Sequence, residues 1–152
     1  MSEMLYQDKI AWLRRYRQAL RRQAELEQEV EQLDSAAKRV TPMLSGMPGG
    51  PGDGNALPRA VETLLEAKAE LEAQCDICGD IRREVVAAIE QVTNRRDNEI
   101  LRRRYILGQR WEEIAVEMHY KYQHICRCHR KAVEKLVIEC DTEKAYTDTM
   151  EW

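Results

Sequence analysis

Cysteine and histidine are the residues of this chain most suited to site chemistry, because both bind metal ions. Cys75 and Cys78 have the spacing of a ligand pair. Four more such residues lie close together further along the chain: His124, Cys126, Cys128 and His129. A structural zinc site needs four converging ligands, whereas the spacing of this second set scatters its side chains around a helix. The sequence therefore predicts no metal site, and we expect no other cofactor.

Catalytic motifs do not occur in the sequence. It contains no GxGxxG, P-loop, HExxH or serine-centred elbow. GGPGDG, residues 49–54, is glycine-rich, but no predicted strand precedes it and no Lys-Ser or Lys-Thr follows it. Glu112 and Glu113 are adjacent, so on a helix their carboxylates point apart. We expect a protein that is not an enzyme.

The charges are unevenly distributed along the chain. Of all residues, 34% are charged and 43% hydrophobic, with no Phe, which favours exposed helices over one large core. Residues 94–138 carry 11 Lys or Arg and 6 Asp or Glu, a balance of +5. The remainder carries a balance of −8, and the whole chain −3. A basic C-terminal part of this kind points toward nucleic acid.

The N-terminal residues MSEMLYQDKIAWLRR place charges where a signal peptide needs an apolar run. No segment approaches the 18 or so apolar residues of a membrane span. The five Cys are an odd number without a secretory context, which indicates reduced thiols. We therefore expect a cytoplasmic protein with no membrane contact.

Two long helices are predicted from apolar residues that recur every three or four positions, over residues 1–40 and 57–93. Between them, residues 41–56 hold three of the four Pro and five of the seven Gly, which predicts a flexible linker. Pro58 suits the first turn of the second helix. Neither narrow apolar stripe can be buried alone. The helices must pair as an antiparallel hairpin or coiled coil, within one chain or between two.

The expected contact face of each long helix follows from this spacing. On the first helix it comprises Tyr6, Ile10, Leu13, Leu20, Ala24, Val30, Leu33, Ala37 and Val40. On the second it comprises Leu57, Val61, Leu64, Lys68, Leu71, Cys75, Cys78, Ile81, Val85, Ile89 and Val92. Small apolar thiols pack well at such positions, which is the structural explanation of the Cys75 and Cys78 spacing.

Residues 94–138 are predicted to form three short helices, with Gly108 ending the first. The expected core is Ile100, Leu101, Tyr105, Leu107, Trp111, Ile114, Ala115, Met118, Ile125, Cys128 or His129, Ala132, Val133 and Leu136. Residues 119–121, HYK, contain no Gly or Pro, so one unbroken helix through them is an alternative. A turn there that buries Tyr120 explains the apolar pattern on both sides better. The prediction is an all-α fold: the long hairpin, a small C-terminal helix-turn-helix domain, and an acidic, frayed tail at 139–152.

The stretch LRRRYILGQRWEEIAVEMHYKYQHICRCHRKAVEKL, residues 101–136, resembles region four of bacterial sigma factors. The resemblance rests on Arg104-Tyr105, Gly108, Glu113-Ile114-Ala115, Tyr120, Ile125 and Lys131-Ala132. The whole chain looks like a small family of sigma-like regulators carried by phages and prophages, akin to the late-gene activators called RinA and ArpU. This resemblance implies a transcription regulator that binds double-stranded DNA through the helix starting near Tyr122, and a contact with RNA polymerase.

The resemblance also implies which side chains meet DNA. By position, Tyr122, Gln123 and Arg127 would meet base edges, where Gln suits adenine, Arg suits guanine and a ring can touch a thymine methyl. The remaining exposed basic or polar residues of the motif would meet phosphates: Arg110, Lys121, His124, Arg130 and Lys131. The alternative explanation is that these are simply solvated residues of an exposed helix.

Three residues depart from the sigma-like pattern. Arg110 and Lys121 stand where Ser or Thr usually caps the second and third helices, and neither can accept an amide proton. Because both stand at helix starts, where a DNA backbone would pass, we expect them to contact phosphates. His119 replaces the usual Gly of the turn, which predicts mild backbone strain there.

Two other functions fit the same pattern. A small-terminase-like phage packaging protein also joins a helix-turn-helix to long helices, but assembles as a ring. A coiled-coil adaptor would pair through the long helices without binding nucleic acid. The long helices could also form a homodimer interface.

Overall fold

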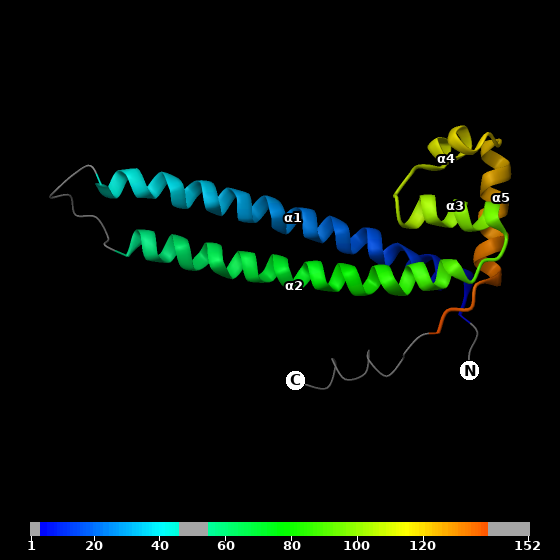
Figure 1. Cartoon of the computed structure of the whole chain (residues 1–152), viewed down its shortest axis with the longest axis horizontal. Helices are drawn as coiled ribbons and strands as arrows, with labels where there is room; N and C mark the ends of the chain where they lie inside the picture. The colour runs from blue at the N-terminus through cyan, green and yellow to red at the C-terminus, as the bar shows by residue number, and fades with distance from the viewer. Residues whose placement is uncertain (1–3, 46–54, 140–152) are drawn as a thin grey trace. The chain divides into compact units, whose positions relative to one another are not determined.

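The computed structural model describes residues 4–45 and 55–139, apart from the side chains of residues 41–45. Within them the fold is all-α, as predicted, with five helices (Figure 1). A long antiparallel pair, α1 (Tyr6–Ser45) and α2 (Ala56–Glu90), precedes three short helices. These are α3 (Arg95–Tyr105), α4 (Trp111–Met118) and α5 (Tyr122–Lys135). The acidic tail that we expected to fray lies outside the described residues, except for Glu139.

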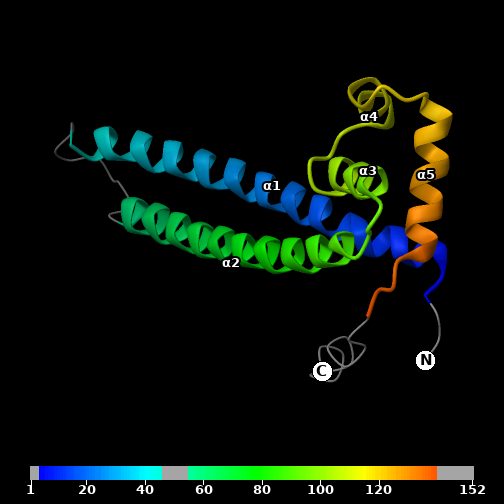
Figure 2. The same cartoon turned by 45° about the vertical axis from the view of Figure 1, so that its right-hand side comes forward.

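The chain divides into two compact units. Residues 15–83 form the hairpin unit, and residues 1–14 together with 84–152 form the C-terminal unit. In the hairpin unit the two helices pair within one chain (Figure 2). The side-chain amide of Gln74 donates to the carbonyl oxygen of Ala19 at 3.0 Å. Arg22 and Glu70 approach to 3.8 Å, which gives the antiparallel register.

The predicted contact faces of the long helices were partly wrong. Leu26 and Ala19 are buried although the pattern omitted them, while the predicted Ala24 is exposed. On α2, Cys78 is buried but Cys75 is exposed. Gln74 takes the half-buried position beside Cys75 because its amide has partners there, the carbonyl of Ala19 and the Cys78 thiol.

The predicted linker boundaries also shift. α1 continues to Ser45, past the expected end at residue 40, and α2 begins at Ala56. Pro42 lies inside the last turns of α1. A proline removes one backbone hydrogen bond to the residue four positions earlier. Only three residues of α1 follow Pro42, so the missing bond lies close to the end of the helix rather than in its middle.

The core of the C-terminal unit joins all three short helices. Ile100, Ile114, Ala115, Ile125 and Cys128 pack together, with Trp111 and Met118 against them. Leu101, Tyr105, His129, Ala132, Val133 and Leu136 are also buried. The predicted core is therefore confirmed except at Leu107, which is 58% exposed because it lies in the loop after α3.

Polar side chains fix the ends of these helices. Asn94 caps α3 by accepting hydrogen bonds from the backbone N–H groups of Arg96 and Asp97. Asn98 donates to the carbonyls of Ile89 and Val92 at 3.0 and 3.2 Å, which ties α3 to the end of α2. The Ile89 carbonyl also accepts the backbone N–H of Val92 at 3.0 Å, so the Asn98 amide adds a second donor there at the end of α2.

Lys9 has a similar role near the start of α1. It is only 5% exposed, and its ammonium group donates to the carbonyl oxygen of Glu134 at 3.0 Å. That carbonyl belongs to the last turn of α5, where a cation also complements the helix dipole. The sequence analysis did not single out Lys9, because a lysine in an amphipathic helix is usually solvent-exposed.

An arginine on α3 holds the loop that leads to α4. The Arg103 guanidinium contacts Glu99 at 2.8 Å and donates to the side-chain oxygen of Gln109 at 3.3 Å. It also pairs with Glu117 of α4. The Gln109 amide donates to the same Glu117 carboxylate at 3.0 Å. This network sets the position of α4 relative to α3.

The bend between α4 and α5 is confirmed at residues 119–121. His119 adopts the left-handed conformation, with φ 60° and ψ 38°, and Tyr120 N–H donates to the carbonyl of Ala115 at 3.0 Å. The prediction that Tyr120 is buried was wrong, since the side chain is 42% exposed. Met118 and Ile125, on either side of the bend, already pack against the core there.

We predict that His119→Gly stabilises the C-terminal unit. A non-glycine residue at positive φ is strained, and glycine removes the strain, for an expected gain of about 0.5–1 kcal/mol in the free energy of unfolding. Urea unfolding would measure it. Val116→Gly, in the exposed middle of α4, is the matched control and should destabilise by a similar amount. Destabilisation by both substitutions would contradict the prediction.

Candidate nucleic-acid interface

The side of α5 opposite the core is fully available to a ligand. Ile125, Cys128, His129, Ala132 and Val133 are the buried residues of α5. At 100° per residue, the opposite side is formed by Gln123, Arg127, Arg130 and Glu134, and all four are exposed. Gln123 and Arg127, two of the three predicted base-reading residues, therefore lie together at the centre of the exposed side.

Tyr122, the third predicted base-reading residue, does not share that side, because at 100° per residue it is in line with the buried His129 and Val133. Its side chain is 48% exposed at the first position of α5. The thiol of Cys126, one turn further along, raises the pKa of the Tyr122 phenol. A tyrosine phenol is protonated at neutral pH in any case, so Tyr122 can donate a hydrogen bond or present an uncharged ring.

Lys121 occupies the cap position of α5 but provides no cap. Its backbone is extended, its side chain is exposed, and no side-chain cap hydrogen bond forms there. The first turn of α5 contains no acidic residue. A lysine beside the positive end of a helix dipole is unfavourable unless an anion is present. This arrangement supports the assignment of Lys121 to a phosphate.

Arg110 differs from Lys121 because it has an acidic neighbour. The Glu113 carboxylate accepts the backbone N–H of Arg110 at 3.2 Å and contacts its guanidinium at 3.3 Å. That is one half of a capping box, supplied by the third residue of α4. Arg110 remains exposed, but Glu113 offsets part of its charge.

We predict that Lys121→Ser changes stability and DNA affinity in opposite directions. A serine hydroxyl can cap α5, which should raise the free energy of unfolding by about 1 kcal/mol. Loss of the positive charge should weaken DNA binding and reduce its salt dependence by about one phosphate contact. Thermal unfolding and salt-dependent binding measure the two effects. Unchanged affinity and salt dependence would show that Lys121 does not contact phosphate.

The other three predicted phosphate residues differ in their surroundings. His124 is half-buried, with Nε2 at 3.6 Å from the Cys128 thiol and its ring centre 5.2 Å from that of Tyr120. Arg130 is exposed, but it contacts the Glu134 carboxylate at 3.3 Å and lies over the Tyr6 ring. Lys131 is exposed on the flank nearest to α3.

A hollow of about 400 Å³ lies between the start of α3 and α5. It is lined by Asn94, Arg96, Asp97, His124, Arg127, Cys128, Lys131 and Lys135. The sequence analysis missed Arg96 and Lys135 as site residues. Lys135 follows Lys131 by one turn, so helical spacing could have found it. Arg96 belongs to another helix, and only the packing of α3 on α5 brings it there.

Beneath this surface, Tyr105 and His129 form a buried polar pair. The phenol oxygen lies 2.6 Å from Nε2 of His129, and the Trp111 ring packs edge-on against the imidazole at 4.5 Å. Burial, with smaller contributions from Arg104 and Arg14, lowers the pKa of His129 to about 4. Burial also raises the pKa of Tyr105. Both groups are therefore uncharged at neutral pH and connect α3 to α5 inside the core.

The cysteine and histidine groups do not come together as metal ligands. His129 is engaged by Tyr105, His124 contacts only Cys128 among the thiols, and Cys75 is exposed while Cys78 is buried. In the part of the chain that the structure describes, no group of three or more His, Cys, Asp or Glu residues could hold a metal ion.

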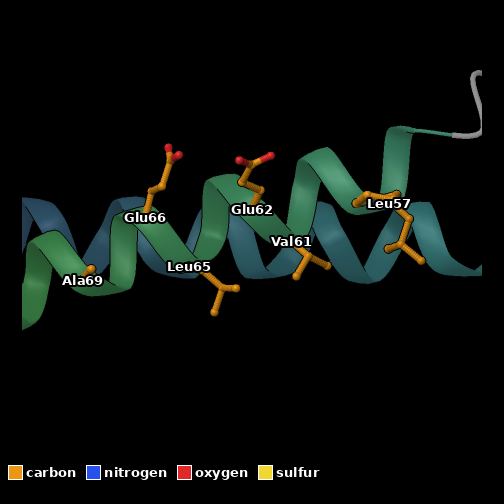
Figure 3. Close-up of a pocket in the computed structure, with 7 residues that line it drawn as sticks. Leu57, Val61, Glu62, Leu65, Glu66 and Ala69 are labelled. Carbon is orange, nitrogen blue, oxygen red and sulfur yellow. The ribbon is translucent and has the colours of Figure 1, made fainter.

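An apolar hollow lies along α2 in the hairpin unit (Figure 3). It is lined by Leu57, Pro58, Val61, Glu62, Leu65, Glu66 and Ala69. Val61 and Leu65 project from one side of the helix, whereas the carboxylates of Glu62 and Glu66 project from the other (Figure 3). Val61 is 41% and Leu65 59% exposed. Without converging polar groups, this surface suits contact with another protein better than chemistry.

No helix within residues 4–45 and 55–139 is both long and apolar enough to cross a membrane. Comparison of the chain with protein-family models, curated proteins and solved structures finds no match. The likeness to sigma region four therefore rests on the quoted residues of the helix-turn-helix alone.

Proposed function

We propose that the protein is a sequence-specific DNA-binding regulator of transcription, and that α5 enters the major groove. The observation that carries the proposal is the position of α5 after a tight turn, with Gln123 and Arg127 exposed opposite its buried side. An α-helix with its side chains is about 10–12 Å across, which matches a major groove about 12 Å wide.

The exposed side chains have the chemistry for base recognition. Gln123 can form two hydrogen bonds with adenine, and Arg127 can form two with guanine. Tyr122, exposed at the first position of α5, can place its ring against a thymine methyl group. Lys121 at the helix start and Lys131 further along would contact phosphates, which position the protein without reading sequence. Arg110, His124 and Arg130 would add to this contact more weakly, because protein groups already engage them.

Regulation of phage or mobile-element genes, and a contact with RNA polymerase, follow from the resemblance to sigma region four. The acidic hairpin unit is the part available for such a contact. It is also the part that would join two copies of the chain, because the exposed Val61 and Leu65 lie along one side of α2.

Selection of bound sequences from a random duplex pool tests the proposal directly. A reader of base edges enriches a short motif containing adenine or guanine at the positions that Gln123 and Arg127 meet. Titration of the enriched duplex at two salt concentrations completes the test, because phosphate contacts weaken steeply with salt. No enrichment and no salt-dependent binding would favour an adaptor without a nucleic-acid role.

A ring-forming DNA-packaging protein is the second candidate. The apolar hollow on α2 favours it, because the exposed Val61 and Leu65 beside the half-buried Leu57 suit self-association. The molecular mass in solution separates the two functions. A monomer or dimer is expected for the regulator, whereas a ring of eight or more chains would overturn that proposal.

A further inference from the structure

The hollow between α3 and α5 concentrates positive charge from two helices. Arg96 comes from the first turn of α3, and Arg127, Lys131 and Lys135 come from successive turns of α5. The three α5 residues are four positions apart, so they follow one side of the helix over about 12 Å. Asp97 is the one carboxylate that lines the hollow.

That carboxylate is already engaged. Asp97 lies 3.2 Å from the Arg96 guanidinium, and its side chain is 16% exposed. Along the described chain, Arg127, Lys131 and Lys135 form no ion pair. The nearby Glu134, on the exposed side of α5, is paired with Arg130. The protein therefore leaves three cations of one hollow without a counter-charge.

Like charges gathered in a hollow repel one another, and low-dielectric walls strengthen the field inside it. A bound anion removes this repulsion. Arg127 connects the hollow to the exposed side of α5, because it lines the hollow and also stands among the base-reading residues. An anion held here would lie directly beside whatever α5 reads.

We propose that this hollow is a binding site for DNA backbone phosphates on the strand that borders the groove read by α5, with Arg96 and Lys135 as contact residues. The inference rests on the proposed function and extends it, since Arg96 lies outside the helix-turn-helix stretch and Lys135, within it, was not among the residues predicted to contact DNA. The contact involves phosphate alone, so it sets the position and angle of α5 on the duplex and carries no sequence preference.

The test compares salt-dependent binding of the full chain and its variants by fluorescence anisotropy, using both the enriched duplex and an unrelated duplex. Lys135→Gln should weaken binding to both duplexes by the same factor, about 3- to 10-fold at low salt. The slope of log affinity against log salt should fall by about 0.9, the value for one lost phosphate contact. Arg96→Gln should have a larger effect, because it also frees the Asp97 carboxylate inside the hollow.

Two controls make the result specific. Lys68→Gln removes the same charge from an exposed position on α2 and should leave the slope unchanged. Lys135→Arg keeps the charge and should bind like the wild type. Thermal unfolding shows whether each variant is folded. If Arg96→Gln is unfolded, the test of the phosphate site depends on Lys135→Gln, which changes an exposed position.

The outcomes separate this inference from the proposed function. If the affinity of the wild type for the duplex falls steeply with salt and Lys135→Gln has the same slope, the hollow is not a phosphate site and the proposed function stands. If Lys68→Gln lowered the affinity and the salt slope as much as Lys135→Gln, the inference would also be overturned, because the effect would then reflect total charge. If the wild type binds neither duplex, the proposed function fails and the inference with it.

Discussion

Substitution of both Gln123 and Arg127 by Ala is expected to abolish the preference for the target sequence. Each two-bond contact to a base contributes about 1–3 kcal/mol of discrimination. The double variant should therefore bind the enriched duplex about 30-fold more weakly or worse. Its affinity for an unrelated duplex should fall only to the extent that Arg127 also contacts phosphate. Anisotropy titrations with both duplexes measure the two affinities.

The fold should survive this change. Both side chains are exposed, and Ala is favourable inside a helix. Circular dichroism and thermal unfolding should match the wild type closely. A matched control is Arg21→Ala with Gln28→Ala, two exposed positions on α1 that remove the same chemical groups. If the double variant at Gln123 and Arg127 still preferred the target, α5 would not be the reading helix.

The helices were predictable because their apolar residues recur with helical spacing. The three short helices and the bend at His119 followed from that spacing and were confirmed. The exact contact face of the long helices was less predictable, since a stripe of alternating small and polar residues allows several phases. The burial of Leu26 and the exposure of Cys75 depend on which residues the other helix presents. No single-helix pattern contains that information.

The candidate site, like the fold, could be predicted from the sequence only in part. Exposure of Gln123 and Arg127 follows from the buried side of α5, so the sequence could place them on the surface. Arg96 is 31 positions away from Arg127 in the chain and lines the same hollow only because α3 packs on α5. The pairs Arg110–Glu113 and Arg130–Glu134 have helical i, i+3 and i, i+4 spacing, so they could have been predicted from the sequence. These contacts show which of the predicted phosphate residues are already engaged by protein groups, a distinction that the prediction from the sequence did not make.

The C-terminal unit is also expected to lose stability in mild acid through His129. Its pKa is about 4 in the folded protein, against an ordinary value of 6.5, because it is buried beside Tyr105 and near Arg104 and Arg14. His129 therefore takes up a proton near pH 6.5 in the unfolded chain, but only near pH 4 in the folded protein. The contribution of the neutral His129 to stability should be fully present above pH 7 and should fall between about pH 6.5 and pH 4. Below pH 4, His129 should cause no further loss.

The expected loss is about 2 kcal/mol between pH 7.5 and pH 5, approaching roughly 3 kcal/mol by pH 4. Because Asp and Glu also begin to titrate there, the measurement is the difference between the wild type and His129→Gln, which cannot gain this charge. Hydrogen exchange of amides in α3 and α5 reports the local free energy of opening at each pH. His124→Gln, which removes a half-exposed imidazole from the same helix, is the control and should follow the wild type.

If His129→Gln and the wild type lost stability in parallel from pH 7.5 to pH 5, the buried imidazole would not be the group that senses acid. A steeper loss in the wild type and in His124→Gln than in His129→Gln would mean that the connection of α3 to α5 requires an uncharged His129.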